Sequence, residues 1–295
     1  MSKFIEHRGA VRSAKKGIIV LYHINCTDGF GAAYAAWKKF GNRANYIPVQ
    51  HQAPPPRGLR GKEIYTVDFS YPMLITQKLL RENKRLTSID HHISAKEATL
   101  STHKPLYAVN HSGAVLSWKY FHPSKNVPRL LLHIEDTDIW KFALPKTREV
   151  FAYLDLFDFN FKTWDRLIHN FENTLKRKHW ISAGAILLKH ERRLIARLVA
   201  NNKELVHFVG KNVYAINSPL FQSELGHILS GLKSPFAIVW KERDGQLFVS
   251  LRGDGSIDVS KIAQRYGGGG HKGAAGFTVP INKKPWKVIR RVERV

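Results

Sequence analysis

Short apolar runs alternate with segments of helical periodicity over the first third of the chain. Residues 17–22 form a continuous aliphatic run, and further strand-like runs occur at residues 44–49, 63–68 and 85–90. A short continuous run of this kind is typical of a strand buried on both faces. Between the runs, AAYAAWKKF and MLITQKLLREN place apolar residues at helical spacing. The alternation predicts an α/β fold with a parallel sheet and helices on both faces, in which ligands bind beyond the carboxyl ends of the strands.

Turn and cap residues separate these elements. Residues 50–61 combine prolines, glycines and arginines, which suit neither a helix nor a strand. Pro72 stands where a first helical turn would begin, and Ser112 is a candidate N-cap for the helix after a strand at residues 105–109. Another helix starts at Pro128 and runs into the stretch HIEDTDIWKF. We therefore expect the α/β alternation to continue into this region.

The pattern changes near residue 149 and again near residue 204. The first change opens a long, almost entirely helical stretch, and the second opens a segment of short strands with helices near Glu224 and Asp258. The chain thus divides into five parts: a basic tail (1–16), an N-terminal parallel-sheet domain (17–148), a helical connector (149–203), a smaller C-terminal α/β domain (204–280) and a second basic tail (281–295).

Charge narrows the choice of partner. The chain has 47 Lys and Arg residues against 23 Asp and Glu, which gives a formal charge of +24. Such an excess favours a polyanionic partner, nucleic acid first and an acidic membrane surface second, with an adaptation to solubility or salt as the alternative. The single cysteine excludes an internal disulfide, and no stretch is apolar over the roughly 18 residues of a membrane span. We expect a soluble, cytoplasmic protein without a membrane partner.

Carboxylate, imidazole and thiol side chains follow the ends of the predicted strands. They are His23, Cys26, Asp28, Asp68, Asp90, His91 and His92, joined by Asp136 and Asp138 in a later helical segment. In an α/β sheet these points converge on one edge. A site rich in carboxylates with a few imidazoles suits Mn²⁺ or Mg²⁺ better than structural zinc, which prefers thiolates. Two such ions can activate water and neutralise charge at phosphorus.

The motifs HINCTDG, VDF, SIDHH and EDTD, with SLRGDGSIDVSKIAQRYGGGGHKGAAGF far downstream, resemble the DHH family of phosphoesterases with its DHH-associated C-terminal domain. The resemblance covers about residues 17–280. It is strongest to the nano-RNase, oligoribonuclease-like members, which share the opening YH-x-x-C-x-DGFGAA and degrade very short RNAs from the 3′ end. It implies that residues 17–148 are the DHH catalytic domain and residues 204–280 the DHH-associated, substrate-binding domain.

The resemblance also implies roles for individual residues. The metal ligands would be His23, Asp28, Asp68, His91 and Asp136. Asp68 would bridge two ions, with Mn²⁺ expected first and Mg²⁺ as the other option. The EDTD spacing offers both Asp136 and Asp138, and we favour Asp136.

Cys26 departs from the family pattern, because many members carry a carboxylate there. A thiol is a softer ligand that must lose its proton to bind a metal. Cys26 therefore either ligates one ion, or leaves that ion to fewer protein groups and more water, which we favour slightly. A small buried side chain beneath the turn is an equally good interpretation.

The remaining roles concern catalysis and substrate. Asp90 would either support the site, fixing an imidazole by accepting its N–H, or act as a weak metal ligand, and His92 would face the scissile phosphate. Successive glycines let backbone N–H groups approach a phosphate closely. The resemblance implies that the glycine loop grips the terminal nucleotide, with His271 near the scissile group. The substrate-binding residues would be Arg252, Gly268, Gly269, Gly270, His271 and Lys272.

The expected activity is that of a metal-dependent 3′-5′ exonuclease. It would bind short single-stranded RNA or DNA in a basic cleft between the domains and release nucleoside 5′-monophosphates by metal-activated water. The alternatives are a 3′-phosphoadenosine 5′-phosphate phosphatase, a cyclic-dinucleotide phosphodiesterase, or a nucleic-acid-binding protein whose catalytic centre has decayed. RNA against DNA preference, substrate length and oligomeric state stay open, with a homodimer as one option.

Overall fold

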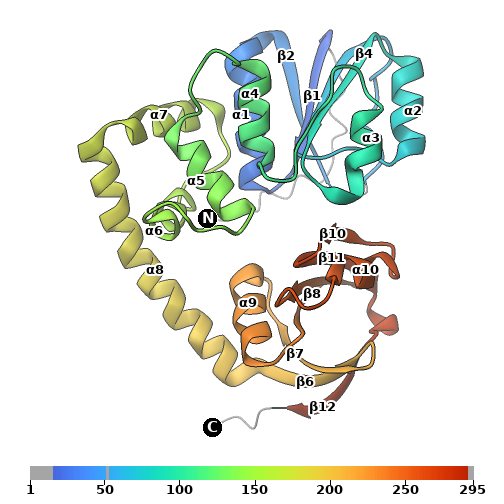
Figure 1. Cartoon of the computed structure of the whole chain (residues 1–295), viewed down its shortest axis with the longest axis vertical. Helices are drawn as coiled ribbons and strands as arrows, with labels where there is room; N and C mark the ends of the chain where they lie inside the picture. Colours follow the sequence, from blue (N-terminus) through green and yellow to red (C-terminus); the bar gives the residue numbers. More distant parts are fainter. Residues whose placement is uncertain (1–15, 51–52, 292–295) are drawn as a thin grey trace. The chain divides into compact units, whose positions relative to one another are not determined.

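The computed structural model describes residues 16–50 and 53–291, which form two compact units that divide at Leu188 and Lys189 (Figure 1). Apart from Lys16, the expected N-terminal basic tail lies outside the described residues. The architecture confirms the predicted class: an α/β protein with an N-terminal parallel sheet, a run of helices and a smaller second α/β unit. Along the described segments, no helix is both long and apolar enough to cross a membrane.

The first unit is built on a five-stranded, fully parallel sheet of order β2-β1-β3-β4-β5. Its strands are β1 (Ile18–His23), β2 (Ala44–Val49), β3 (Glu63–Val67), β4 (Arg85–Asp90) and β5 (Leu106–Tyr107). All five were predicted, although β5 is shorter than expected. Pro48 lies within β2, which is an edge strand of the sheet. A proline is tolerated there because the N–H that it lacks is not needed for pairing with a further strand.

Alternation along the strands creates two apolar layers. Ile19, Leu21 and Ile64 pack with Leu79 of α2 (Met73–Glu82) on one face. Val20 and its neighbours pack on the opposite face, against α1 (Thr27–Phe40) and α4 (Gly113–Phe121). Successive strand side chains point to opposite faces, so continuous apolar runs can fill both layers. The short elements η1 (Gly41–Arg43), η2 (Ile93–Ala95) and α3 (Lys96–Leu100) complete the connections.

Four helices follow the sheet. They are α5 (Arg129–Asp138), α6 (Thr147–Leu154), α7 (Phe161–Glu172) and α8 (Thr174–Asn202). The predicted connector is therefore helical, but its beginning is part of the first unit, because Val150, Trp164 and Phe171 share one apolar core with α1 and α4. Helix α8 runs past the boundary, and its Ile195 packs with Leu225 in the second unit.

The second unit is a seven-stranded sheet of order β10-β11-β9-β8-β7-β6-β12, in which β7 and β8 are the parallel neighbours. Its strands are β6 (Lys203–Phe208), β7 (Lys211–Asn217), β8 (Phe236–Arg243), β9 (Gln246–Gly253), β10 (Gly269–His271), β11 (Ala274–Pro280) and β12 (Lys287–Arg291). Helices α9 (Gln222–Leu232) and α10 (Val259–Gln264) pack against it, α9 with one apolar cluster and α10 with another.

Two segments of the second unit differ from expectation. Residues 281–295 were predicted as a basic tail, yet η3 (Ile281–Lys283) and β12 form there, and β12 pairs with β6. The physical reason is Trp286, which is buried in the core and contacts Phe208, so the chain is anchored before its last basic residues. The glycine run was predicted as a loop, but Gly269 and Gly270, together with His271, make edge strand β10.

Candidate metal centre

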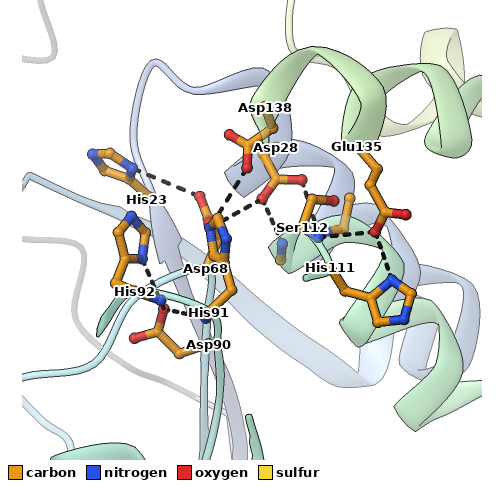
Figure 2. A network of polar contacts seen from close by, with 12 residues as sticks. His23, Asp28, Asp68, Asp90, His91, His92, His111, Ser112, Glu135 and Asp138 are labelled. Carbon is orange, nitrogen blue, oxygen red and sulfur yellow. Dashed lines mark hydrogen bonds and ion pairs between the residues drawn. The ribbon is translucent and has the colours of Figure 1, made fainter. Parts of the chain in front are cut away.

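The polar cluster of the first unit lies where three neighbouring parallel strands end (Figure 2). His23 is the last residue of β1, Asp68 follows β3, and Asp90 ends β4 with His91 and His92 directly after it. Because β1, β3 and β4 are adjacent, their carboxyl ends bring these side chains to one edge of the sheet, as the sequence predicted.

Asp68 is the central carboxylate. Its backbone adopts a left-handed conformation (φ 62°), which Asp tolerates better than most residues, and its N–H donates to the carbonyl of Ile89. The Oδ1 atom lies 3.2 Å from Nε2 of His91, and Oδ2 lies 3.7 Å from Nδ1 of His23. Burial raises the pKa of this carboxyl, but the two imidazoles outweigh it and lower the pKa below its usual value. Asp68 is therefore an anion whose two oxygens face two different sets of groups.

Asp28, in the first turn of α1, is buried against the start of α4. Its carboxylate accepts hydrogen bonds from the N–H groups of Gly113 (2.6 Å) and Ala114 (2.9 Å). Free N–H groups at a helix start stabilise an anion. Burial, followed by the nearby carboxylates of Asp138 and Asp68, nevertheless raises the pKa of Asp28. An added cation would stabilise the ionised form of a carboxylate that is buried beside other carboxylates.

The approach of α4 to the cluster requires glycine. A methyl group on Gly113 would lie 2.6 Å from Cβ of Asp68 and 2.9 Å from Oδ2 of Asp28. A methyl on Gly29 would lie 2.4 Å from the carbonyl oxygen of His23. These distances are far below van der Waals contact, so these two glycines set how closely the carboxylates approach one another.

We expect Gly113→Ala to reduce catalytic activity by about a hundredfold and to lower the free energy of unfolding by about 1–3 kcal/mol, because the added methyl displaces Asp68. The measurements are urea denaturation and turnover with metal present. Gly231→Ala is the matched control: that glycine lies within α9, no neighbouring atom lies within 4 Å of the place an added methyl would take, and the change should be neutral or stabilising. Wild-type activity in Gly113→Ala would contradict the packing argument.

His91 joins the carboxylates. Its Nε2 lies 3.6 Å from Oδ2 of Asp138 and 3.9 Å from Oδ2 of Asp28, in addition to its contact with Asp68. Burial lowers the pKa of His91, but the hydrogen bond to Asp68 and the charges of Asp138 and Asp28 raise it to about 10. Partial burial raises the pKa of Asp138 to about 6. In the protein alone, the protonated imidazole thus supplies a positive charge that a metal ion would replace.

The structure places Asp138, and not the favoured Asp136, in this cluster. Asp136 points into the loop after α5, where its carboxylate accepts hydrogen bonds from the N–H groups of Ala143 (2.7 Å) and Leu144 (3.0 Å) and from the hydroxyl of Thr147 (2.6 Å). Both carboxylate oxygens of Asp136 therefore accept hydrogen bonds from the segment that follows α5. The structure therefore brings Asp138 rather than Asp136 to the other candidate ligands, because two residues of helix rotate the side chain by about 200°; which of the two binds a metal ion stays a prediction.

The described residues of the first unit supply two groups of possible ligand atoms among themselves. One comprises His23, Cys26 and Asp68, and the other Asp28, His91 and Asp138; within each, one donor atom per residue lies within 4.8 Å of the others. Mainly carboxylate and imidazole donors fit Mn²⁺ or Mg²⁺. Asp68 belongs to the first group and contacts His91 of the second, which is the position of a bridging carboxylate.

Cys26 is the N-cap residue of α1 and is partly exposed. Desolvation, followed by the charges of Asp68 and Asp138, raises the pKa of its thiol well above the ordinary value. The protein alone therefore keeps Cys26 protonated. The thiol lies within reach of a cation between His23 and Asp68, so both ligand and non-ligand interpretations stay open.

Asp90 holds the two histidines that follow it. Its Oδ1 accepts hydrogen bonds from the N–H of His91 (2.7 Å), the N–H of His92 (3.1 Å) and Nδ1 of the His92 ring (2.8 Å). Asp90 is fully buried, and although burial lowers the pKa of His92, the contact with Asp90 raises it. This geometry fixes the orientation of the His92 ring, the kind of support that the sequence suggested for Asp90.

A second polar contact was missed by the sequence analysis. Glu135 accepts hydrogen bonds through Oε2 from the N–H of Ser112 (2.9 Å) and from Nδ1 of His111 (3.0 Å), and it joins α5 to the start of α4 (Figure 2). Ser112 caps α4 as predicted, its hydroxyl accepting from Val115. Because Glu135 precedes Asp138 by about one helical turn, this contact positions the end of α5 that carries Asp138. The Glu that opens the EDTD motif was the signal for this contact in the sequence.

The proposed substrate-binding residues lie in the second unit. Arg252 of β9 is paired with Ala274 of β11, which is paired in turn with His271 of β10, so the three side chains share one row and one face of the sheet. The guanidinium of Arg252 donates to the hydroxyl of Ser223 on α9 (3.0 Å). Lys272 occupies the turn between β10 and β11 and accepts a hydrogen bond from Val259 through its carbonyl.

The glycines of this unit have a structural role of their own. A methyl on Gly268 would lie 2.1 Å from the carbonyl oxygen of Gly276, and Gly270 has a left-handed φ of 138°. Gly269 faces Gly276 across the strand pair. Close packing of β10 on β11 thus explains Gly268 and Gly270 without a ligand, and any phosphate contact is an additional use of the same backbone.

Comparison with known proteins supports part of this picture. Residues 212–293 match the DHHA1 domain family, a stretch that overlaps most of the DHH-associated domain expected at residues 204–280. The chain is 29% identical over 287 residues to the uncharacterized protein R106 of Acanthamoeba polyphaga mimivirus; the match covers 88% of this chain but 66% of that protein's length.

Three solved structures are similar at low identity. An uncharacterized protein from Helicobacter pylori G27 has 16% identity and a TM-score of 0.43, covering 90% of this chain and 93% of its own. The pGpG-specific phosphodiesterase PggH from Vibrio cholerae has 11% identity and a TM-score of 0.46, covering 90% and 94%. An exopolyphosphatase-related protein from Bacteroides fragilis has 15% identity and a TM-score of 0.46, covering 90% and 88%.

Proposed function

We propose that the protein is a metal-dependent phosphodiesterase of the DHH type that removes nucleoside 5′-monophosphates from the 3′ end of short single-stranded oligonucleotides. The observation that carries the proposal is the position of Asp68, a buried carboxylate whose two oxygens face two groups of metal-compatible side chains. The DHHA1 match in the second unit and the formal charge of +24, which favours a polyanionic substrate, support it.

In this proposal some residues bind the metal ions and others orient the groups that contact the phosphate. His23 and Asp68 would hold one divalent cation, Asp28, His91 and Asp138 would hold the other, and Asp68 would contribute to both. Bound there, Mn²⁺ or Mg²⁺ would supply an activated water and neutralise charge developing at phosphorus. Asp90 keeps the His92 ring fixed, and His92 contacts the phosphate through Nε2, as donor when protonated. The raised pKa of His92 favours that protonated state.

The second unit supplies contacts to the substrate in this proposal. Arg252 and His271 share one sheet face, and the guanidinium of Arg252, which donates to the Ser223 hydroxyl and the Leu251 carbonyl, would also donate to a phosphate. Lys272 adds positive charge in the adjacent turn. The backbone of β10 adds N–H donors, and the lack of a side chain at Gly269 would let a phosphate approach them closely.

The test is product analysis. Purified protein is incubated with Mn²⁺ and 5′-labelled oligonucleotides of two to five residues, as RNA and as DNA. We expect the labelled oligonucleotide to become shorter by one nucleotide at a time, with release of nucleoside 5′-monophosphate. We expect no reaction in EDTA. Parallel reactions with pGpG, a cyclic dinucleotide and 3′-phosphoadenosine 5′-phosphate define the substrate class. Tight, salt-sensitive binding without any product would contradict the proposal and favour a binding protein.

A further inference from the structure

The loop directly after Asp138 carries an unusual backbone. Trp140 (φ 57°), Phe142 (φ 50°) and Lys146 (φ 67°) are all left-handed, although none is a glycine. Bulky aromatic residues rarely adopt this conformation, and it persists only where surrounding contacts enforce it. Such residues are common at ligand-binding positions, so the loop at residues 139–146 invites a functional explanation.

Asp136 enforces this conformation. Its carbonyl accepts hydrogen bonds from the N–H groups of Lys141 and Phe142, while its carboxylate accepts from Ala143, from Leu144 and from the Thr147 hydroxyl. Five donors therefore converge on one residue, which the metal cluster does not use. Thr147 begins α6, so the same contacts fix the loop relative to the helix that follows it.

The loop presents two aromatic rings beside a cation. Trp140 and Phe142 are half-buried and meet edge to face, with ring centroids 4.8 Å apart. The guanidinium carbon of Arg148 lies 3.7 Å from the Phe142 centroid and 5.8 Å from that of Trp140. Among the described residues, no carboxylate forms an ion pair with Arg148. The N–H donors of Arg148 are therefore available to an anion. The contact with the Phe142 ring restricts the movement of the guanidinium.

We propose that Trp140, Phe142 and Arg148 form a nucleotide-binding platform beside the metal centre. Trp140 stacks on a base of the substrate, Phe142 holds the guanidinium of Arg148, and Arg148 donates to a neighbouring phosphate. Proximity follows from the chain itself: Trp140 is two residues from Asp138, so their Cα atoms are at most about 7 Å apart. The platform determines specificity for the activity proposed above and rests on it, because only a nucleic-acid substrate brings both a base and a phosphate to this position.

Binding and hydrolysis are measured separately, so that the two proposals can fail independently. Fluorescence anisotropy in Ca²⁺ gives the affinity for a labelled trinucleotide and for the same molecule with an abasic residue. We expect the wild type to prefer the base-containing molecule. Trp140→Leu should weaken its binding about tenfold and remove the preference, because one base stack is lost. Arg148→Ala should weaken binding of both molecules.

Hydrolysis of bis(p-nitrophenyl) phosphate by the wild type with Mn²⁺ tests the proposed activity separately, because this diester carries no base for the platform to bind. Arg243→Ala is the matched control, since it removes the same charge and a similar contact with Phe248 in the other unit; its trinucleotide affinity should change little. Unchanged affinity in both Trp140→Leu and Arg148→Ala, or equal losses in Arg243→Ala, would overturn the platform. Base-dependent binding without any hydrolysis would overturn only the proposed activity.

Discussion

Asp68→Asn is expected to reduce turnover of oligonucleotides by about a thousandfold while the protein stays folded. Asparagine is nearly isosteric and tolerates the left-handed backbone at this position, so the substitution removes charge without adding strain. An amide cannot bridge two cations as a carboxylate does, and it also stops neutralising His91. The measurements are turnover, circular dichroism and the number of Mn²⁺ ions bound per chain.

The decisive outcome for Asp68 is the metal count. We expect it to fall from two ions to one or none, together with activity. Asp165→Asn is a suitable control, because Asp165 contacts Lys38 and Tyr34 outside the cluster and no metal role is proposed for it. Activity within tenfold of wild type in Asp68→Asn would remove the bridging carboxylate from the proposed function.

Asp138→Asn is expected to lose activity, whereas Asp136→Ala is expected to lose stability. Asp138→Asn should lower activity by about a hundredfold with little loss of stability, because Asp138 adds negative charge to an already crowded cluster. Asp136→Ala should lower the free energy of unfolding by about 3 kcal/mol, because it leaves buried N–H donors and the Thr147 hydroxyl without their acceptor. Urea denaturation and activity at saturating Mn²⁺ separate the two effects.

Thr147→Val provides a graded comparison for Asp136. It removes one of the three hydrogen bonds to the carboxylate, together with the contact between the Thr147 hydroxyl and Nδ1 of His133, and should cost about 1–2 kcal/mol. If Asp136→Ala instead kept full stability and lost metal binding, the assignment of Asp136 to the loop and of Asp138 to the metal centre would have to be exchanged.

Local sequence was sufficient for most of the secondary structure. Apolar runs predicted all five parallel strands of the first unit, and Ser112 was identified as the cap of α4. It was not sufficient at residues 281–291, where a basic composition suggested a tail. Burial of a single residue, Trp286, decides the outcome there, and burial depends on a core built by distant strands.

The sequence by itself determined that His23, Asp68 and Asp90 meet at one sheet edge, because the ends of adjacent parallel strands must converge. It could not decide between Asp136 and Asp138, since both lie on the same helix and only the packing of α5 against α4, through Glu135 and Ser112, sets which side faces the cluster. Nor could it show that Gly113 supports Asp68 at close range, or that Arg148 lies over Phe142, because these contacts join separate elements. Motif order defines which groups are present, whereas tertiary packing defines which oxygens and nitrogens face one another.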